Sequence, residues 1–323
     1  MQPVGWGILS TARINELFLD GVAPSELVEV LAVAGRDRER AVAFAADHGI
    51  ERVHGSYEAL LADPEVEAVY IPLPNSLHIE WTVRALKAGK HVLCEKPLSR
   101  HAEKVERAFD TAEREGRLLM EAFMYRHNPQ TRRLTELVAD GAIGSLRLIR
   151  AAFSFTARDP ANIRLSRELD GGALMDVGCY CISGARLLGG EPERVHAEQV
   201  LGGDGVDVVF AATMRFGGDV LAQFDAGLAL APRDELEVVG DEGSLFLDDP
   251  WHARSPLIEL RREDRVERIE GPLANSYRLE AENFSRAIRG ESEPLLGRAD
   301  AIGQARAIEA LYRAADTGQQ VTL

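Results

Sequence analysis

The first third of the chain alternates short apolar runs with stretches in which apolar residues recur every three or four positions. The apolar runs have the length of buried strands, and the stretches between them have the spacing of amphipathic helices. Strands and helices that alternate in this way are joined by right-handed crossovers, which predicts an α/β domain with a doubly wound parallel sheet of the Rossmann type. The expected strands are Val4–Leu9, Val28–Ala34, Ala68–Ile71, 92–94 and 118–121, and the expected helices are 38–47, 76–88 and Ala102–Glu115.

Beyond residue 122 the pattern changes to alternation with a period of two, interrupted by turn residues. Such runs predict an α+β domain with a large, mostly antiparallel sheet that leaves one face open. We therefore expect a dinucleotide-binding domain over 1–122 and a second domain over 123–323, whose last helix, 298–316, is a candidate for packing back on the first. The expected strands are 146–155, 206–216, 219–227, 236–239, Ser244–Leu247, 258–261 and 266–269, and Pro129–Ala139 is an expected helix.

Composition excludes several classes of partner. The 323 residues carry a formal charge of −15, which repels phosphate backbones, so no nucleic acid is expected. Cys94, Cys179 and Cys181 have no zinc-ligand spacing, so we expect reduced thiols and no metal site. No run is apolar enough for a membrane span, and no basic segment precedes the first apolar run as in a signal peptide. These features predict a cytoplasmic protein without a membrane partner.

The turn after the first expected strand is where a Rossmann domain binds the pyrophosphate of a dinucleotide. The usual glycines are all substituted, although Ser10 and Ala12 are small enough to let backbone amides approach a phosphate. The cofactor-binding residues predicted in this turn are Ser10, Thr11, Ala12, Arg13 and Ile14.

The end of the second expected strand indicates which dinucleotide is bound. An NAD site usually has a carboxylate at this point to hold the ribose diol, whereas this strand ends in Gly35 and Arg36. A guanidinium suits a 2′-phosphate, so the sequence favours NADP over NAD without excluding NAD. The alternative is that Arg36 and Arg38 simply begin a solvated helix.

A proline-rich loop, 71–78, follows the third expected strand. Its two prolines stiffen the backbone, so the loop can wall one side of a nicotinamide, with Pro72, Leu73 and Asn75 as the predicted contacts. His78 is either a further cofactor contact or a structural hydrogen-bonding residue.

Glu95 and Lys96 follow the next expected strand, at the end where ligands bind in open α/β sheets. An ammonium buried without a partner costs several kcal/mol, on the order of the penalty for an interior charge, whereas a lysine that faces a cleft can orient a substrate hydroxyl. We predict that Lys96 contacts substrate and cofactor and that Glu95 lies beside the cofactor. The alternative is an exposed ion pair followed by a turn proline.

The segment 171–180 is the main candidate site of the second domain. If a helix begins near Asp176, then Asp176 and Tyr180 are one turn apart and share a face, while Gly172 and Gly178 leave room for a ligand. A phenol has a pKa of about 10, and a nearby ammonium lowers it, so a tyrosine paired with a lysine can exchange protons near neutral pH. The alternative is a core tyrosine with a capping aspartate.

Three motifs in this order resemble the Gfo/Idh/MocA family of nicotinamide-dependent sugar and polyol oxidoreductases: Glu95-Lys96-Pro97, 121–129 and 171–180. The resemblance covers nearly the whole chain. It implies catalytic roles for Lys96 and Asp176, and it implies that Tyr180 is the acid/base, as in the tyrosine branch that includes NADP-dependent xylose dehydrogenases and dimeric dihydrodiol dehydrogenases. It also implies that Arg164 belongs to a loop that contacts the cofactor and the substrate.

The expected activity is hydride transfer between NADP(H) and a carbinol or carbonyl carbon of a sugar or related cyclic diol. Alternatives are a ketoreductase for nucleotide-linked deoxysugars and a ligand-sensing regulator without turnover. We also expect a homodimer or homotetramer built on the second-domain sheet. The candidates for substrate contact on the second-domain loops are Arg158, Asn162, Arg164 and Arg167.

Overall fold

A computed structural model of the chain describes residues 2–323 and divides into two compact units. The first contains the residues up to Met124 together with Asn275–Ile302, and the second contains Tyr125–Ala274 and Gly303–Leu323. The prediction that placed 275–302 in the second domain is wrong. These residues include α8 (Ser276–Ile288), where Ser285 Oγ accepts a hydrogen bond from Trp6 Nε1 at 3.2 Å. The pattern of a helix shows which of its faces is buried but not which sheet it covers.

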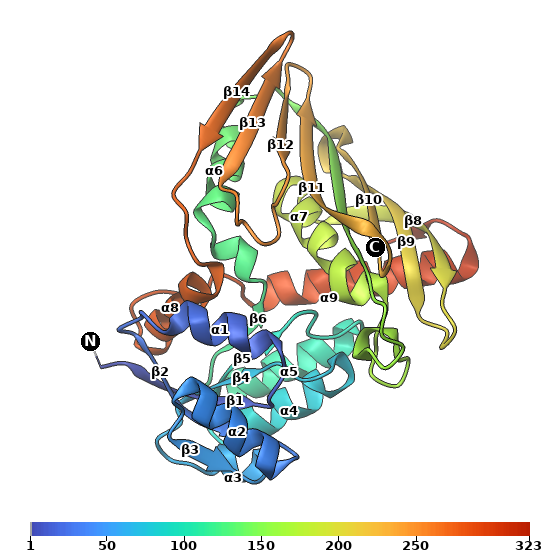
Figure 1. Cartoon of the computed structure of the whole chain (residues 1–323). Coiled ribbons are helices and arrows are strands. Elements are labelled where there is room, and N and C mark those ends of the chain that lie inside the picture. The colour runs from blue at the N-terminus through green and yellow to red at the C-terminus, as the bar shows by residue number, and fades with distance from the viewer. Residues whose placement is uncertain (1) are drawn as a thin grey trace. The chain divides into compact units, whose positions relative to one another are not determined.

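The described part of the first unit is a doubly wound sheet of six parallel strands in the order β3-β2-β1-β4-β5-β6, which confirms the predicted fold class (Figure 1). The strand order reverses between β1 and β4, and open α/β sheets bind their ligands at such a point. The elements besides α8 are β1 (Val4–Leu9), α1 (Ile14–Val22), β2 (Val28–Ala34), α2 (Arg38–His48), β3 (Arg52–His54), α3 (Tyr57–Leu61), β4 (Ala68–Ile71), α4 (Asn75–Lys87), β5 (His91–Glu95), α5 (Ala102–Glu115) and β6 (Leu119–Ala122).

The second unit is a sheet that, within residues 2–323, has nine strands in the order β14-β13-β12-β11-β7-β10-β9-β8-β15. Only the pair of β7 and β10 is parallel among them, so the predicted antiparallel sheet is confirmed. Its elements are α6 (Pro129–Ala139), β7 (Leu146–Thr156), a π-helix (Leu174–Gly178), α7 (Cys179–Gly189), β8 (Pro192–Leu201), β9 (Asp207–Phe216), β10 (Leu221–Gly227), β11 (Ala229–Gly240), β12 (Ser244–Leu247), β13 (Leu257–Arg262), β14 (Arg265–Glu270), α9 (Arg298–Thr317) and β15 (Val321–Thr322).

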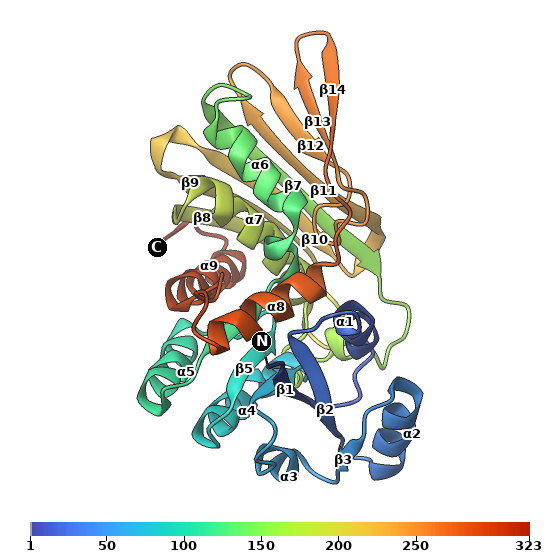
Figure 2. The same cartoon turned by 90° about the vertical axis from the view of Figure 1, so that its left-hand side faces the viewer.

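Helices α6 and α7 lie over one face of this sheet (Figure 2). The alternation along the strands follows from that arrangement: Phe210 of β9 and Phe224 of β10 are buried on the helix side, whereas Thr213 and Gln223 point to the open face. The open face is hollowed by about 600 Å³. It is lined by Arg150, His196, Glu198, Thr213, Gln223, Asp225, Arg233, Glu235, Glu237 and Phe246 together with small residues between them.

Helix α9 belongs to both units. Its first turn lies in the first unit, where Arg298 forms ion pairs with Asp110 at 2.7 Å and Glu113 at 3.2 Å on α5. From Gly303 onward the helix belongs to the second unit, where Tyr312 donates a hydrogen bond to Asp207 at 2.9 Å. Among residues 2–323, no helix is both long and apolar enough to cross a membrane.

Candidate active site and cofactor site

The turn after β1 is shaped by side chains at the positions where glycines are usual. Ser10 has a φ of 125°, a region that glycine adopts more easily than any other residue. Its hydroxyl accepts a hydrogen bond from the amide of Ala12 at 3.2 Å and donates to the carbonyl of Pro72 at 3.4 Å, while Asn15 Nδ2 donates to the Ser10 carbonyl at 2.8 Å. The loops after β1 and β4 are therefore joined where the strand order reverses. The turn precedes the N-terminus of α1 and carries no acidic residue, and the nearest one, Glu16 in the first turn of α1, is exposed, so the turn fits an anionic pyrophosphate.

The carboxylate that follows the end of β2 caps a helix. Asp37 Oδ1 accepts from the amide of Arg40 at 3.1 Å and so caps α2. Arg36 is exposed, and Arg40 Nη2 donates to the carbonyl of Thr11 at 3.1 Å. These guanidinium groups beside the first turn fit a 2′-phosphorylated dinucleotide. The sequence did not single out Arg40, because it looks like any solvated residue of an exposed helix.

The loop that carries Lys96 is held through the carboxylate of Glu95. Glu95 Oε1 accepts from the Tyr70 hydroxyl at 2.6 Å, and its Oε2 accepts from the amide of Lys96 at 3.2 Å. Burial raises the pKa of Tyr70 well above its ordinary value, and the charge of Glu95 adds to this, so the phenol keeps its proton and donates it. On the other side of the loop, Glu121 Oε1 accepts from the amide of Leu98 at 2.7 Å.

His78 belongs to α4 and is 1% exposed. Its Nδ1 lies 2.9 Å from the carbonyl oxygen of Pro97, and its Nε2 lies 2.7 Å from that of Leu73. Both ring nitrogens are thus engaged by the backbone. The structure favours the structural alternative for this residue over direct contact with the cofactor.

Tyr180 lies in the first turn of α7 and is 8% exposed. Its ring packs against Phe153 at 5.4 Å, Tyr125 at 5.8 Å and Trp251 at 6.0 Å between centroids. Trp251 is fully buried, and a Cβ atom on Gly184 would lie 2.8 Å from its ring, so α7 packs against this indole only because that position has no side chain. These contacts fix the orientation of the phenol.

Asp176 lies on the π-helix that precedes α7, four residues before Tyr180. Its Oδ2 accepts from Arg164 Nε at 2.7 Å. The Arg164 side chain is 42% exposed and the Asp176 side chain 14%, so the guanidinium reaches solvent beside a mostly covered carboxylate. Asn162 Oδ1 accepts from the amide of Arg164 at 3.1 Å and fixes the start of this short loop.

Gly171 lies where two segments of the backbone come close together. A Cβ on Gly171 would lie 2.4 Å from the Arg164 carbonyl oxygen, so glycine lets the Arg164 loop approach. Asp170, which directly precedes Gly171, adopts a φ of 58°. Aspartate tolerates this left-handed conformation better than most residues. Of the other predicted substrate contacts, Arg158 and Arg167 are exposed on the same connection between β7 and the π-helix.

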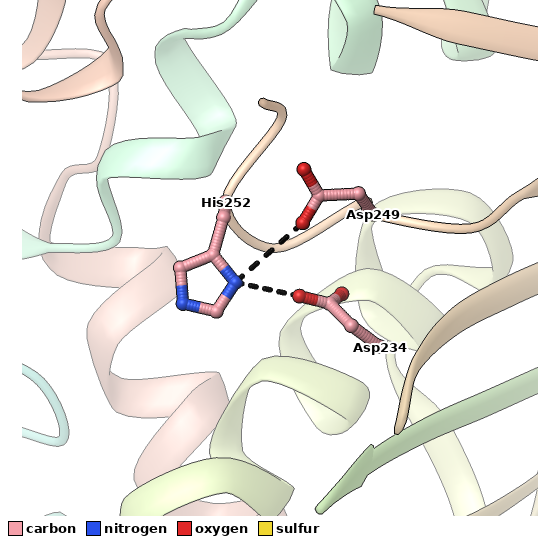
Figure 3. A group of neighbouring side chains, drawn as sticks. All are labelled: Asp234, Asp249 and His252. Carbon is pink, nitrogen blue, oxygen red and sulfur yellow. Dashed lines mark hydrogen bonds and ion pairs between the residues drawn. The ribbon is translucent and has the colours of Figure 1, made fainter. Parts of the chain in front are cut away.

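Asp234, Asp249 and His252 form a polar cluster in the second unit (Figure 3). His252 Nδ1 lies 2.6 Å from Asp234 Oδ2 and 3.7 Å from Asp249 Oδ1. Burial raises the pKa of Asp234, while the bonds from Arg254 hold that of Asp249 below its ordinary value against the opposing effect of burial. The three side chains have the composition of a metal site, but Arg254 at 2.9 Å already neutralises Asp249.

The cluster connects to Tyr180 through Trp251 and Phe153. Asp234 accepts from the amide of Trp251 at 3.2 Å, and the His252 ring packs edge-on against Phe153 at 5.5 Å. We therefore assign the cluster a structural role. No sequence motif marked these residues, which come from β11 and from the connection between β12 and β13.

The predicted site residues fall in both units. Lys96 and the predicted dinucleotide contacts other than Arg164 belong to the first unit, and Asp176, Tyr180 and Arg164 belong to the second.

Two family models match the chain. Residues 4–123 match the model described as an oxidoreductase family with an NAD-binding Rossmann fold, and residues 131–246 match that of the GFO/IDH/MocA C-terminal domain. The chain is 39% identical to D-xylose 1-dehydrogenase (NADP(+)) 2 of Haloferax volcanii, over 98% of this chain and 99% of the relative.

Solved structures agree with these matches. A 3-ketoreductase from Actinomadura kijaniata, solved with NADP and TDP-benzene, has a TM-score of 0.92 and 34% identity, over 97% of this chain and 98% of that chain. An aldose-aldose oxidoreductase from Caulobacter crescentus has a TM-score of 0.91 and 29% identity, over 99% and 100% of the two chains. The protein therefore belongs to the Gfo/Idh/MocA family of oxidoreductases.

Proposed function

We propose that the protein is an NADP(H)-dependent oxidoreductase that transfers a hydride between the nicotinamide and a carbinol or carbonyl carbon of a sugar or related cyclic diol. The observation that carries this proposal is Tyr180, a proton-bearing group whose ring is fixed by aromatic packing four residues after Asp176. The names of the relatives support the substrate class, since they include a xylose dehydrogenase and a sugar ketoreductase.

In this proposal each residue has a separate task. Tyr180 takes the hydroxyl proton of the substrate during oxidation and returns it during reduction. Lys96 holds the substrate oxygen and favours the phenolate by its charge. Asp176, oriented by Arg164, accepts a hydrogen bond from a second hydroxyl of the substrate. When bound, the cofactor supplies the hydride chemistry, and the side chains supply position and charge.

The test is turnover with NADP and with NADPH against two panels. The first contains aldoses, ketoses and cyclic diols, and the second contains TDP-linked ketosugars. Turnover with the first panel is the expected result. Turnover with the second panel alone would favour the ketoreductase alternative, which the likeness to the Actinomadura kijaniata enzyme supports. Cofactor binding without turnover on either panel would favour a ligand sensor.

Cofactor preference is expected to depend on Arg36. Arg36→Ala should weaken NADP binding by about 1.5–3 kcal/mol, the usual worth of a hydrogen bond to a charged group, with little effect on NAD, because NAD has no 2′-phosphate for the guanidinium to contact. Fluorescence titration of wild type and variant with both cofactors measures this. Arg38→Ala, at the exposed first position of α2, two residues after Arg36, is the matched control. Equal losses for NADP and NAD in Arg36→Ala would contradict a phosphate contact.

We further propose that the open face of the second-domain sheet pairs two copies of the chain. That face is wide and hollowed, and ion pairs cross its strands: Arg150 of β7 pairs with Glu237 of the neighbouring β11, and Arg233 of β11 pairs with Asp225 of β10 across β7. Light scattering at micromolar concentration is expected to show a dimer or tetramer.

Substitutions on that face provide the test. Thr213 and Gln223 are cross-strand neighbours that line the hollow, so Thr213→Arg with Gln223→Arg should place like charges at a dimer contact and yield monomers. Leu273→Arg, at a position 74% exposed outside the sheet, should leave assembly unchanged. A wild-type monomer would rule out the proposal.

A further inference from the structure

Two histidines of the first unit, the buried His78 and the half-buried His91, have opposite surroundings. His78 faces a carbonyl oxygen at each ring nitrogen, Leu73 at 2.7 Å and Pro97 at 2.9 Å. His91 faces donors instead: its Nδ1 accepts from the amide of Leu118 at 3.0 Å, and Arg117 Nη1 lies 3.4 Å from its Nε2.

The surroundings determine which protonation state each ring favours. A neutral imidazole has one N–H and one lone pair, whereas an imidazolium has two N–H groups. A carbonyl oxygen opposite the lone pair of a neutral His78 would be repelled and left without a donor, which is costly for a buried polar group. The imidazolium satisfies both carbonyls. At His91 the argument reverses, and burial together with the charge of Arg117 lowers its pKa to about 4.

The charges on the neighbouring elements do not decide the state of His78. On α4 itself, Glu80 and Arg84 pair with each other at 2.6 Å, and Lys87 is exposed at the other end of the helix. In the loop after β5 and on β6, two carboxylates, Glu95 and Glu121, are balanced by two cations, Lys96 and Arg100. Helix α5, which packs beside α4, buries only apolar residues and Thr111. The two carbonyl oxygens at the ring nitrogens of His78 therefore carry the argument for its charge.

We infer that His78 is an imidazolium clamp that joins the loop after β4 to the loop after β5 and thereby positions Lys96. The inference deepens the proposed function and rests on it for the role of Lys96. The clamp acts through the backbone: Pro97 follows Lys96 directly, and Leu73 belongs to the loop predicted to wall the nicotinamide. His78 is thus a positioning residue, which explains why a fully covered histidine lies between these two functional loops.

The charge of the ring can be measured without turnover. In ¹⁵N NMR spectra of the wild-type protein at pH 7, we expect both nitrogens of His78 to be protonated. His91 and His127 serve as internal references, because burial lowers their pKa values to about 4 and about 3, so both should be neutral. The resonances are assigned from His78→Gln, and if that variant does not fold, from variants of the seven other histidines in turn. A neutral His78 ring would overturn the inference.

The positioning role has its own readout. Glutamine has no charge, and it can donate to both carbonyls only from its single nitrogen. His78→Gln should therefore lower kcat by up to about 10²-fold, the effect of a misplaced catalytic group. The affinity for NADP(H) should stay near that of the wild type. His101→Gln, an exposed histidine of the same unit, should leave kcat unchanged. Unchanged kcat in a folded His78→Gln protein would refute the positioning role. A charged His78 in a protein that turns over no substrate would instead leave the clamp intact and reject the proposed function.

Discussion

Replacing Tyr180 with phenylalanine is expected to lower turnover by about 10²–10⁴, the contribution of a positioned general acid/base, while NADP(H) affinity stays close to wild type. The substitution is well matched to the structure, because the ring is 8% exposed and packs against Tyr125, Phe153 and Trp251, contacts that phenylalanine retains. Only the hydroxyl is lost. Steady-state kinetics with an accepted substrate and a fluorescence titration of the cofactor measure the two quantities. Near-normal turnover would remove Tyr180 from the mechanism.

Lys96→Ala tests whether the lysine and the tyrosine act as a unit. It should also reduce turnover, and the pH at which residual oxidation rises should move upward, because phenolate forms less easily without a neighbouring ammonium. The turnover of the double variant should be close to that of the slower single variant, because the effects of two residues that act in the same step are not additive. Fully additive losses in Lys96→Ala with Tyr180→Phe would show that the two residues serve independent steps.

The fold could be predicted largely from local patterns. The helix Pro129–Ala139 and the strand Val28–Ala34 lie where the periodicity placed them, because each buries apolar residues at the spacing of its element, such as Leu134 and Leu137 in the helix. Weakly buried elements were missed. β3 has three half-buried residues, and β8 buries only three of its ten, so neither produces a strong alternating signal.

The arrangement of the candidate site residues could be predicted only where they are close in sequence. Asp176 and Tyr180 are four residues apart, so one motif reveals both, although not the π-helix that carries Asp176. The aromatic packing around Tyr180 combines Phe153 of β7 with Trp251 from the connection between β12 and β13. No single stretch of sequence reveals that contact. Long-range packing of this kind depends on the whole sheet.

Glu280 of α8 is another residue that the sequence did not reveal, and it leads to the second large prediction. It is 0% exposed, and among the described residues neither of its carboxylate oxygens has a hydrogen-bond partner. Burial raises its pKa well above the ordinary value, and the charge of Glu95 acts in the same direction. Tyr277, one turn earlier, has its pKa raised by burial as well. The carboxyl is therefore protonated in the folded protein at pH values where it ionises in the unfolded chain.

The pH dependence follows from this difference. Between the unfolded pKa, about 4.3, and the raised folded pKa, the folded state binds one more proton than the unfolded state at this position. The contribution of Glu280 to the free energy of unfolding therefore falls as pH rises through that interval. Glu280 makes the folded protein less stable at pH 8 than at pH 5. Glutamine has nearly the same shape and does not titrate, so Glu280→Gln removes this loss.

Glu280→Gln is therefore expected to gain stability relative to wild type by about 1.4 kcal/mol for each pH unit above about 5, until the folded pKa is reached. Urea unfolding from pH 5 to 8, followed by tryptophan fluorescence, measures the gain, because two of the three tryptophans, Trp6 and Trp81, are buried in the same unit. Glu291→Gln, at an exposed position just after α8, is the control and should differ from wild type by a constant amount at every pH. A difference between Glu280→Gln and wild type that does not change with pH would show that Glu280 is ionised in the fold, held by a cation or by water that reaches its carboxylate.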